Sequence, residues 1–332
     1  MRKFTHAIVI IMGCVAILSA CGSGKKSDPF RKDSKGNTVP VENYVGVAID
    51  ETFRPVFDIL MKDFRERFPD AFTDPIYVPE DSAIHMLLDD SIRSIVVTRT
   101  LSDKEKDYLM DKHRLMVKKK IVAFDAVALI TNLSSPDTLI SKDEIRGIVS
   151  GRIKDWSQLK HSNGQKGEIE VVFDNNGSST LRYMKDSLCG GQLPKGKLRA
   201  AKTHEELISY ISRTKNAIGV LGADYLRNPK DTTRLSLLST VRVMSVGAND
   251  SQYEDDYYKP FQFYIASGSY PLTRSLFIIT TDPRNKSMER NFYFYLIDAP
   301  THNNMGQMII LKYSQLLPYV AVQSRSVVIK KY

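Results

Sequence analysis

Apolar residues recur along much of the chain at helical spacing, in segments that follow short apolar runs. The stretch ETFRPVFDILMKDFRERF carries apolar side chains at intervals of three and four, which predicts an amphipathic helix over residues 51–68. Thr52 is the expected N-cap, and Pro55 suits the first turn. The apolar run over residues 45–50 immediately before it predicts a strand.

The same two patterns predict the elements of the remaining chain. Strands are expected over residues 75–78, 94–98, 121–131, 168–173, 217–221, 241–246, 275–281 and 326–330. Helices are expected over residues 81–90, 102–112, 141–150, 177–188, 203–213 and 288–297. Three of these helices begin with a capping box, at Ser102 with Glu105, Ser141 with Glu144 and Thr203 with Glu206. Strands that alternate with helices predict an α/β fold with mainly parallel sheets.

The N-terminus has the pattern of an export signal. Arg2 and Lys3 precede an apolar segment, residues 7–17, which is too short to span a bilayer. The following LSAC sequence resembles a bacterial lipobox, so residues 1–20 are predicted to be a lipoprotein signal peptide and Cys21 the lipidated residue. An ordinary signal peptide with a chance cysteine is the alternative. Residues 21–40 are polar and read as a flexible tether. We therefore expect a protein of the cell envelope, anchored by its lipid on the periplasmic side.

Composition and charge narrow the class of protein. The 332 residues suffice for two domains, and 42% hydrophobic with 26% charged residues is typical of a globular protein. The net charge of +9 is spread among acidic residues, without a basic stripe interleaved with aromatic residues. This predicts a mild general attraction for anions and no nucleic-acid partner. Beyond Cys21, only Cys189 remains, so no intramolecular disulfide is expected.

The segment FDNNGSSTLRYMKDSL is the clearest candidate site. It begins at the end of an apolar strand and continues as a helix, with Gly177, Ser178, Ser179 and Thr180 at the junction. Backbone N–H groups, hydroxyl groups and the positive end of the helix dipole would together hold an oxyanion. Ordinary helix capping is the alternative reading. The segment matches neither a phosphate-binding P-loop nor a nucleophile elbow. The six histidines show no metal-ligand spacing, so no metal, cofactor or catalytic residue is expected.

Four motifs in order resemble the solute-binding proteins of phosphate ABC uptake systems. They are AFDAVALITN, ISKDEIRGIVSGRIKDWSQL, NAIGVLGADYL and YPLTRSLFIIT, and they span residues 123–280. The segment from Asn176 to Thr180 corresponds to a D-G-S-G-T-type loop of that family. The resemblance extends more weakly to about residue 45.

The resemblance implies a two-lobed, clamshell-like fold of the type II periplasmic-binding-protein class, with a hinge and a ligand held between the lobes. The first lobe would comprise residues 41–126 and 240–332, and the second residues 127–239. Several helix N-termini would then face the ligand. The implied ligand-binding residues at these positions are Thr52, Phe53, Ser82, Gly177, Ser178, Ser179 and Thr180.

Two charged positions depart from the family pattern. Asp174 stands where the family has an arginine before its Gly-Ser loop, and Arg99 stands near the family's acidic acceptor. We hypothesise that the two charges are exchanged, so that Arg99 supplies the cation and Asp174 accepts the proton of hydrogen phosphate. The alternatives are a solvated arginine at a strand end and an Asx-turn aspartate.

The resulting prediction is a binding protein and not an enzyme. It would capture inorganic phosphate and deliver it to the permease of an ABC transporter. Alternatives are a protein of the same fold that binds sulfate or another oxyanion, and a lipoprotein with a degenerate cleft that acts as a protein-interaction module. A hydrolase or transferase reading lacks a recognisable triad or metal set.

Overall fold

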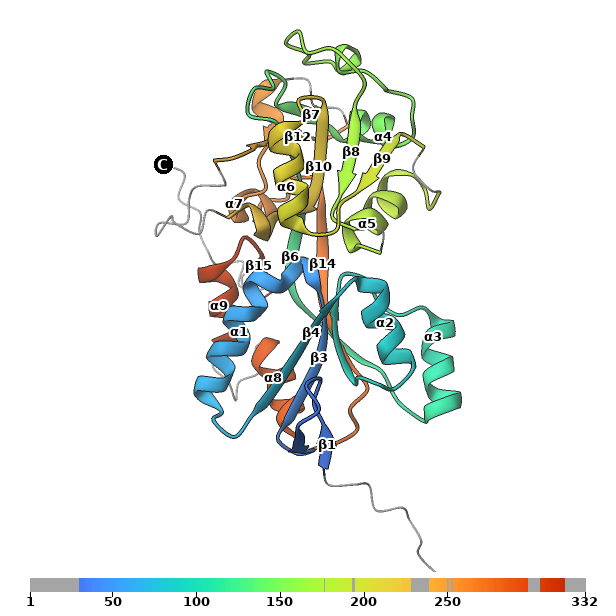
Figure 1. The fold of residues 1–332 in the computed structure, drawn as a ribbon, viewed down its shortest axis with the longest axis vertical. Helices are drawn as coiled ribbons and strands as arrows, with labels where there is room; N and C mark the ends of the chain where they lie inside the picture. Colours follow the sequence, from blue (N-terminus) through green and yellow to red (C-terminus); the bar gives the residue numbers. More distant parts are fainter. Residues whose placement is uncertain are drawn as a thin grey trace, which may run out of the picture.

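The computed structural model describes residues 30–175, 177–192, 195–227, 239–249, 251, 253–297 and 305–319. Two lobes are stacked along the long axis, and strands β6 (Lys118–Thr131) and β14 (Thr273–Thr280) run between them (Figure 1). The predicted signal peptide, the predicted lipidation site Cys21, Asn176 and the strand expected at residues 326–330 lie outside the described residues. Within the described ranges, no helix is long and apolar enough to cross a membrane.

The first lobe is built on three parallel strands, in the order β4 (Phe72–Val78), β3 (Tyr44–Asp50) and β5 (Ser94–Val97). β14 continues this sheet in the antiparallel direction. All seven residues of β3 are buried because helices cover both faces of the sheet. A two-stranded hairpin, β1 (Phe30–Lys32) with β2 (Thr38–Pro40), precedes the sheet, and Ser34 in its turn is hydrogen-bonded to Asp74 of β4. The flexible tether predicted for residues 21–40 is therefore wrong from residue 30 onward.

Helices on the two faces of this sheet enclose two apolar cores. On one face, Phe57 and Phe64 pack with Phe292 and Ile310. The helices of that face are α1 (Arg54–Arg67), α8 (Met288–Leu296) and α9 (Met305–Tyr313). On the other face, Leu87 packs with residues of β3 and β5. The helices there are α2 (Glu80–Leu88), α3 (Asp103–Tyr108) and the π-helical turn η2 (Leu109–His113).

The second lobe continues the same sheet beyond β6. The strands follow in the order β10 (Ala217–Gly222), β8 (Glu170–Phe173) and β9 (Lys197–Ala200). Short strands β11 (Arg242–Val243) and β15 (Leu317–Pro318) also pair with β6. The helices are α4 (Lys142–Val149), α5 (Ser179–Leu188), α6 (His204–Arg213) and α7 (Gln262–Ala266). A small separate sheet contains β7 (Leu139–Ser141), β12 (Ser245–Gly247) and β13 (Tyr257–Tyr258).

Four 3-10 turns complete the described elements. They are η1 (Glu51–Phe53), η3 (Trp156–Gln158), η4 (Ala223–Leu226) and η5 (Glu254–Asp256). Trp156 is fully buried in the second lobe, and its Nε1–H donates to the Asn216 carbonyl at 3.2 Å. The single tryptophan is therefore a core residue.

The helix starts agree with the sequence patterns at most positions. Ser102 and Ser141 form the capping boxes expected for them. At Thr203 only half of the expected box is present, because its hydroxyl accepts from Glu206 N–H while the Glu206 carboxylate accepts from Lys202 N–H. At the first helix the cap differs, because the Asp50 side chain accepts from Thr52 N–H and Thr52 itself lies inside η1. The chain makes a 3-10 turn before α1, which a spacing of three and four does not distinguish from a continuous helix.

Two features of the topology differ from expectation. The α/β fold is confirmed, but the sheet is mixed, because β6 pairs antiparallel to both β10 and β14. In both lobes, strands that are distant in sequence pair with each other, and the periodicity of the sequence does not predict such pairing. We expected the chain to return to the first lobe at residue 240, but the second lobe's core still contains Val241, Val243, Met244, Val246, Ile265, Tyr270 and Leu272. The return occurs along β14.

Candidate functional site

The start of η1 and the start of α5 meet between the lobes. Thr52 follows β3, and Ser179 is the first residue of α5 after β8. Their hydroxyl oxygens lie 3.5 Å apart, and both side chains are buried. Ser178 caps α5 by accepting from Leu181 N–H at 3.2 Å. Two helix starts with hydroxyl donors thus face the same point, an arrangement that favours an anion.

Arg274 on β14 supplies a buried positive charge at this point. Its Nε donates to Asp125 Oδ2 and its Nη1 to Ser179 Oγ, both at 2.8 Å. Burial lowers the pKa of Arg274, but Asp125 and Asp50 raise it by more, so the guanidinium stays charged. The Nη2 atom is buried without a hydrogen-bond partner among the described residues. The guanidinium also lies over the Phe53 ring, 5.5 Å from its centroid.

Asp50 lies at the same junction and is fully buried. Its Oδ1 accepts from Thr52 N–H at 3.0 Å, whereas Oδ2 has no partner within the described part of the chain. Burial, followed by the charge of Glu80, raises the pKa of Asp50 to about 7, against the lowering effect of Arg274. Near neutral pH the protonated and the ionised forms of this carboxyl group are therefore both populated.

Asp174 is also buried, and it contacts a hydroxyl group and an imidazole ring. Thr180 Oγ1 donates to Asp174 Oδ1 at 2.7 Å, and His204 Nε2 lies 3.1 Å from Oδ2. Burial raises the pKa of Asp174, yet the contacts with His204, Ser178 and Thr180 outweigh it and leave the pKa below its ordinary value. The His204 ring stacks on Tyr225 at a centroid distance of 3.7 Å. Asp174 thus belongs to a hydrogen-bonded group that orders the start of α5.

Glycines allow the two lobes to approach closely. A Cβ atom on Gly222 would lie 2.4 Å from Thr52 Cγ2, and one on Gly177 would lie 3.3 Å from Pro79 Cβ. Contacts of this kind leave no room for a side chain at residue 222. The backbone at Gly222 in the second lobe therefore lies directly against the Thr52 side chain of the first lobe.

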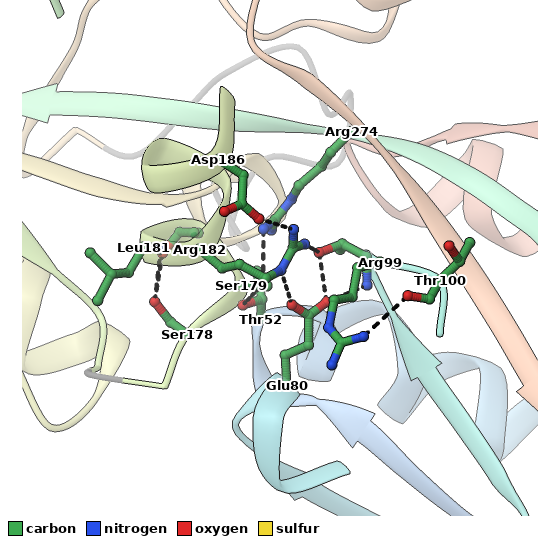
Figure 2. Close-up of polar contacts among 12 residues, drawn as sticks. Thr52, Glu80, Arg99, Thr100, Ser178, Ser179, Leu181, Arg182, Asp186 and Arg274 are labelled. Atoms are coloured by element: carbon green, nitrogen blue, oxygen red, sulfur yellow. Dashed lines mark hydrogen bonds and ion pairs between the residues drawn. The ribbon is translucent and has the colours of Figure 1, made fainter. Parts of the chain in front are cut away.

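An ion pair links the lobes next to the site, as Figure 2 shows. Arg182 on α5 donates from Nε to Glu80 Oε2 on α2, and its Nη2 donates to Thr98 Oγ1 at 2.7 Å. Glu80 also accepts from Thr98 N–H at 2.6 Å and from the Thr98 hydroxyl at 2.8 Å. Burial raises the pKa of Glu80, but Arg182 and Thr98 lower it further, so the carboxylate is ionised. The donors of Arg182 and Thr98 are therefore already hydrogen-bonded to the Glu80 carboxylate.

Two expected site residues form no side-chain hydrogen bond with this cluster within the described part of the chain. Arg99 donates to both carboxylate oxygens of Glu105, at 2.8 and 2.9 Å. Figure 2 shows its guanidinium turned to the Thr100 carbonyl, which accepts at 3.1 Å. Ser82 is exposed on the first turn of α2. The charged groups that meet at Ser179 are instead Arg274 and Asp50.

Sequence reasoning did not select five charged residues of the interlobe region, namely Asp50, Glu80, Asp125, Arg182 and Arg274. Asp125 and Arg274 do fall within two of the motifs that carry the family resemblance. A charged residue inside an otherwise apolar strand indicates a buried charge, and a buried charge requires a partner. This was the signal by which both residues could have been selected. Among the described residues, no group of three or more His, Cys, Asp or Glu side chains is arranged to hold a metal ion.

Comparison with known proteins assigns the fold to a family. A family model described as "PBP superfamily domain" matches residues 36–299, which is most of the chain. The chain belongs to the PBP superfamily.

Several relatives of this superfamily member are named for what they bind. Phosphate-binding protein PstS of Staphylococcus epidermidis is 23% identical over 304 residues, covering 90% of this chain and 86% of the relative. PstS of Bacillus subtilis is 24% identical over 274 residues, covering 82% of each chain. These relatives are named as binding proteins and not as enzymes, in agreement with the class predicted from sequence.

Solved structures have the same fold. A putative phosphate ABC transporter substrate-binding protein from Clostridium perfringens, solved with bound phosphate, has a TM-score of 0.65 at 18% identity. It is matched over 99% of its length and 83% of this chain. An ABC-type phosphate transport receptor from Vibrio cholerae has a TM-score of 0.61 at 16% identity, over 83% of this chain and all of the receptor. The predicted type II periplasmic-binding-protein fold is thereby confirmed.

Proposed function

We propose that this PBP superfamily protein binds inorganic phosphate, or a closely related oxyanion, between its two lobes. The observation that carries the proposal is the meeting of Thr52, Ser179 and Arg274 at two helix starts. Hydroxyl groups, helix N-termini and a buried guanidinium are the donors that oxyanions prefer. The named relatives from Staphylococcus and Bacillus support phosphate as the anion.

In this proposal Arg274 is the cation of the site. It already donates to Ser179 Oγ, and its Nη2 has no partner among the described residues. The guanidinium of Arg99, by contrast, forms an ion pair with Glu105. Arg274 thus takes the role that the charge-exchange hypothesis gave to Arg99.

Asp50 is the proposed proton acceptor for hydrogen phosphate. Its free Oδ2 lies at the same junction, faced by Arg274, Glu80, Thr52 and Ser179. An ionised Asp50 would accept the proton of the ligand and would reject sulfate, which has none. Because its pKa is raised to about 7, this discrimination would strengthen as the pH rises above neutrality. If Asp50 stays protonated when ligand binds, the site would instead take sulfate equally well.

A lipid at Cys21 would hold the protein at the outer face of a membrane, where an ABC permease could receive the anion. The lipobox-like LSAC sequence and the polar tether support this location. The permease is proposed from the family role of the named relatives.

One observation favours a second candidate, a protein-interaction module with a closed cleft. The Glu80 carboxylate occupies the donors of Thr98 and Arg182 and ties the lobes together. In that case no small anion would stabilise the fold.

The test is thermal unfolding of residues 21–332 with Cys21→Ser, which retains every described residue. Bound anion is removed first, and phosphate, sulfate and chloride are compared at equal ionic strength. A ligand at about 100 times its dissociation constant adds about 2.7 kcal/mol to the folded state, a shift of several degrees. Phosphate alone is expected to produce it. A shift with both anions favours the general oxyanion alternative, and no shift with either favours the interaction module.

Two variants assign the residues. Ser179→Ala removes a hydroxyl beside Arg274 and should weaken phosphate binding about 10-fold or more, since hydrogen bonds to charged groups contribute about 1.5–3 kcal/mol. Arg99→Ala is the matched control and should leave affinity unchanged. If Arg99→Ala weakens phosphate binding and Ser179→Ala does not, Arg99 is the cation of the site.

A further inference from the structure

A second cavity lies on the first lobe, away from the interlobe site. It has a volume of about 390 Å³ and lies between the start of β6 and one side of α8. Thr280 at its edge follows Arg274 by six residues of β14, which places it about 20 Å along the strand from the interlobe cluster. The cavity is therefore independent of the site proposed for phosphate. Pockets of about 300–1,000 Å³ hold drug-sized molecules, so its volume suits an organic ligand better than a single small ion.

One side of the cavity is an apolar stripe of α8. Tyr293, Phe294 and Ile297 line it together with Arg290. These four positions recur at intervals of three and four, so they share one face of the helix. The core-facing residues of the same helix, Phe292 and Tyr295, are fully buried elsewhere. Tyr293 and Ile297 are half-buried at the edge of this core, and Phe294 lies outside it, so the cavity borders the core along one side of α8.

The other side is cationic. Lys118, Lys119 and Lys120 begin β6, and their backbone pairs with the end of β14. Lys118 and Lys120 stand opposite Thr280 and Ile278, and Ile278 packs in the core beneath α8. Alternation along the strand therefore directs these two lysines to the α8 face. Lys119 stands opposite Ile279, which belongs to the core on the other face.

The positive charges at the cavity are not neutralised from within the described residues. None of the three lysines forms an ion pair there, and Arg290 contacts only the neutral Asn285 side chain at 3.4 Å and the Phe294 ring. The acid in the lining, Asp282, is held by both Nε and Nη2 of Arg284, at 2.7 and 3.0 Å. An apolar wall beside unpaired cations selects for a molecule with an apolar body and an anionic head.

We propose that this cavity binds an amphipathic anion, with its phosphate or carboxylate head at Lys118, Lys120 and Arg290 and its apolar body against Tyr293, Phe294 and Ile297. The cavity lies at the end of the lobe where the N-terminal segment joins. Arg284 donates to the Val41 carbonyl at 2.8 Å, and Met288 N–H donates to the Glu42 carbonyl at 2.8 Å. In Figure 1, the β1 hairpin lies at the end of the first lobe far from the second. A protein anchored through that segment would turn the cavity toward the membrane, so the ligand's source is an anionic lipid or a soluble amphipathic anion.

The first test measures binding of octyl phosphate below its micellar concentration to residues 21–332 with Cys21→Ser. The double variant Lys118→Gln/Lys120→Gln should weaken this binding about tenfold or more, because charge-assisted contacts to the head are lost. Lys119→Gln is the control on the other face of the strand. It removes one positive charge where the double variant removes two, and it should alter the affinity less than about twofold. An equal loss in both variants would overturn the proposal, as would the absence of octyl phosphate binding.

Further arms separate the parts of the proposal. Phe294→Ser should weaken octyl phosphate and leave inorganic phosphate binding unchanged; an unchanged octyl phosphate affinity would place that ligand outside the cavity and refute the proposal. Octyltrimethylammonium, with the same chain and opposite charge, should not bind. Co-sedimentation with vesicles of phosphatidylglycerol and phosphatidylcholine, lost in the Lys118→Gln/Lys120→Gln variant, would identify a membrane lipid as the source. Octyl phosphate binding without co-sedimentation would identify a soluble anion.

Discussion

The ion pair between Glu80 and Arg182 should contribute measurably to stability, because it joins the lobes in a buried position. The perturbation is a double-mutant cycle with Glu80→Gln, Arg182→Gln and the combined variant. Glutamine keeps the size of Glu80 and shortens the side chain of Arg182, and each change removes a charge. The cycle isolates the interaction between the two residues from the separate cost of each change.

The expected magnitude follows from burial and hydrogen bonding. The Glu80 side chain is 1% exposed and accepts from Arg182 as well as from Thr98, whereas the Arg182 side chain is 21% exposed. Removing one partner of a fully buried pair costs about 3–5 kcal/mol, and the partial exposure of Arg182 reduces this. We expect each single variant to lose about 2–3 kcal/mol, and a coupling energy of about 1–3 kcal/mol.

The assay is urea unfolding followed by tryptophan fluorescence and by circular dichroism. Trp156 is the only tryptophan and lies buried in the second lobe, so its fluorescence reports on that lobe while dichroism reports on the whole chain. Coincident transitions would justify a two-state analysis. The pair Lys197 and Glu168 is the exposed control, with its nitrogen and oxygen 2.9 Å apart and side chains 51% and 60% exposed. Its coupling should lie within experimental error, since exposed pairs contribute little.

A coupling energy for Glu80 and Arg182 no larger than that of the exposed control would refute this reasoning. It would mean that desolvation of Glu80 cancels the attraction between the charges, as happens in some buried pairs. The link would then fix the relative position of the lobes without stabilising the fold.

Three further changes test other parts of the structure. Gly222→Ala should destabilise the protein by about 1–3 kcal/mol, because its Cβ would lie 2.4 Å from Thr52 Cγ2. Thr52→Ser removes that methyl group, so the double variant should regain much of the lost stability. Burial raises the pKa of Asp224 to about 7 in the folded state, so between pH 4 and 7 the native protein retains a proton that the unfolded chain releases. Stability therefore falls by up to about 1.4 kcal/mol per pH unit in that window and levels off above it. Asp224→Asn should reduce this loss of stability. Cys189 should react with an alkylating reagent more slowly in the native than in the unfolded protein, because burial raises the pKa of its half-buried thiol.

Each of these predictions has a contrary outcome. Failure of Thr52→Ser to rescue Gly222→Ala in urea unfolding would mean that the close approach of β10 to η1 is not the source of the strain. Identical pH profiles of urea midpoints for the wild type and Asp224→Asn would show that Asp224 releases its proton equally in both states. Equal alkylation rates at pH 8 with and without urea would show that the folded structure does not protect Cys189.

Local chemistry determined most of the helices and strands from sequence. The capping boxes at Ser102 and Ser141 act between residues three apart, so their pattern is visible without any tertiary contact. The buried strand β3 is likewise visible as an uninterrupted apolar run. Where the first helix begins was less certain, because Asp50 caps η1 from the end of a strand and the turn before α1 has the same spacing as the helix.

The oxyanion-type loop was also determined by sequence, and the resemblance carried by four motifs predicted the α/β binding-protein fold that the family match confirms. Ser178 and Ser179 could be selected because small residues between a strand and a helix leave backbone N–H groups accessible. Neighbours in sequence were sufficient for this part of the candidate site.

Only the tertiary structure decided which charges surround that loop. Ser179 meets Thr52 from 127 residues away and Arg274 from 95 residues away. Arg99 was a plausible partner in the alignment, yet Glu105, six residues along, takes its guanidinium. A charge is paired by whatever the folded chain brings within a few ångströms, and its electrostatic role follows from that partner and from burial. Local sequence therefore specified the donors of the loop, and the folding of two distant strands onto it specified Arg274 and Asp50 as its charged neighbours.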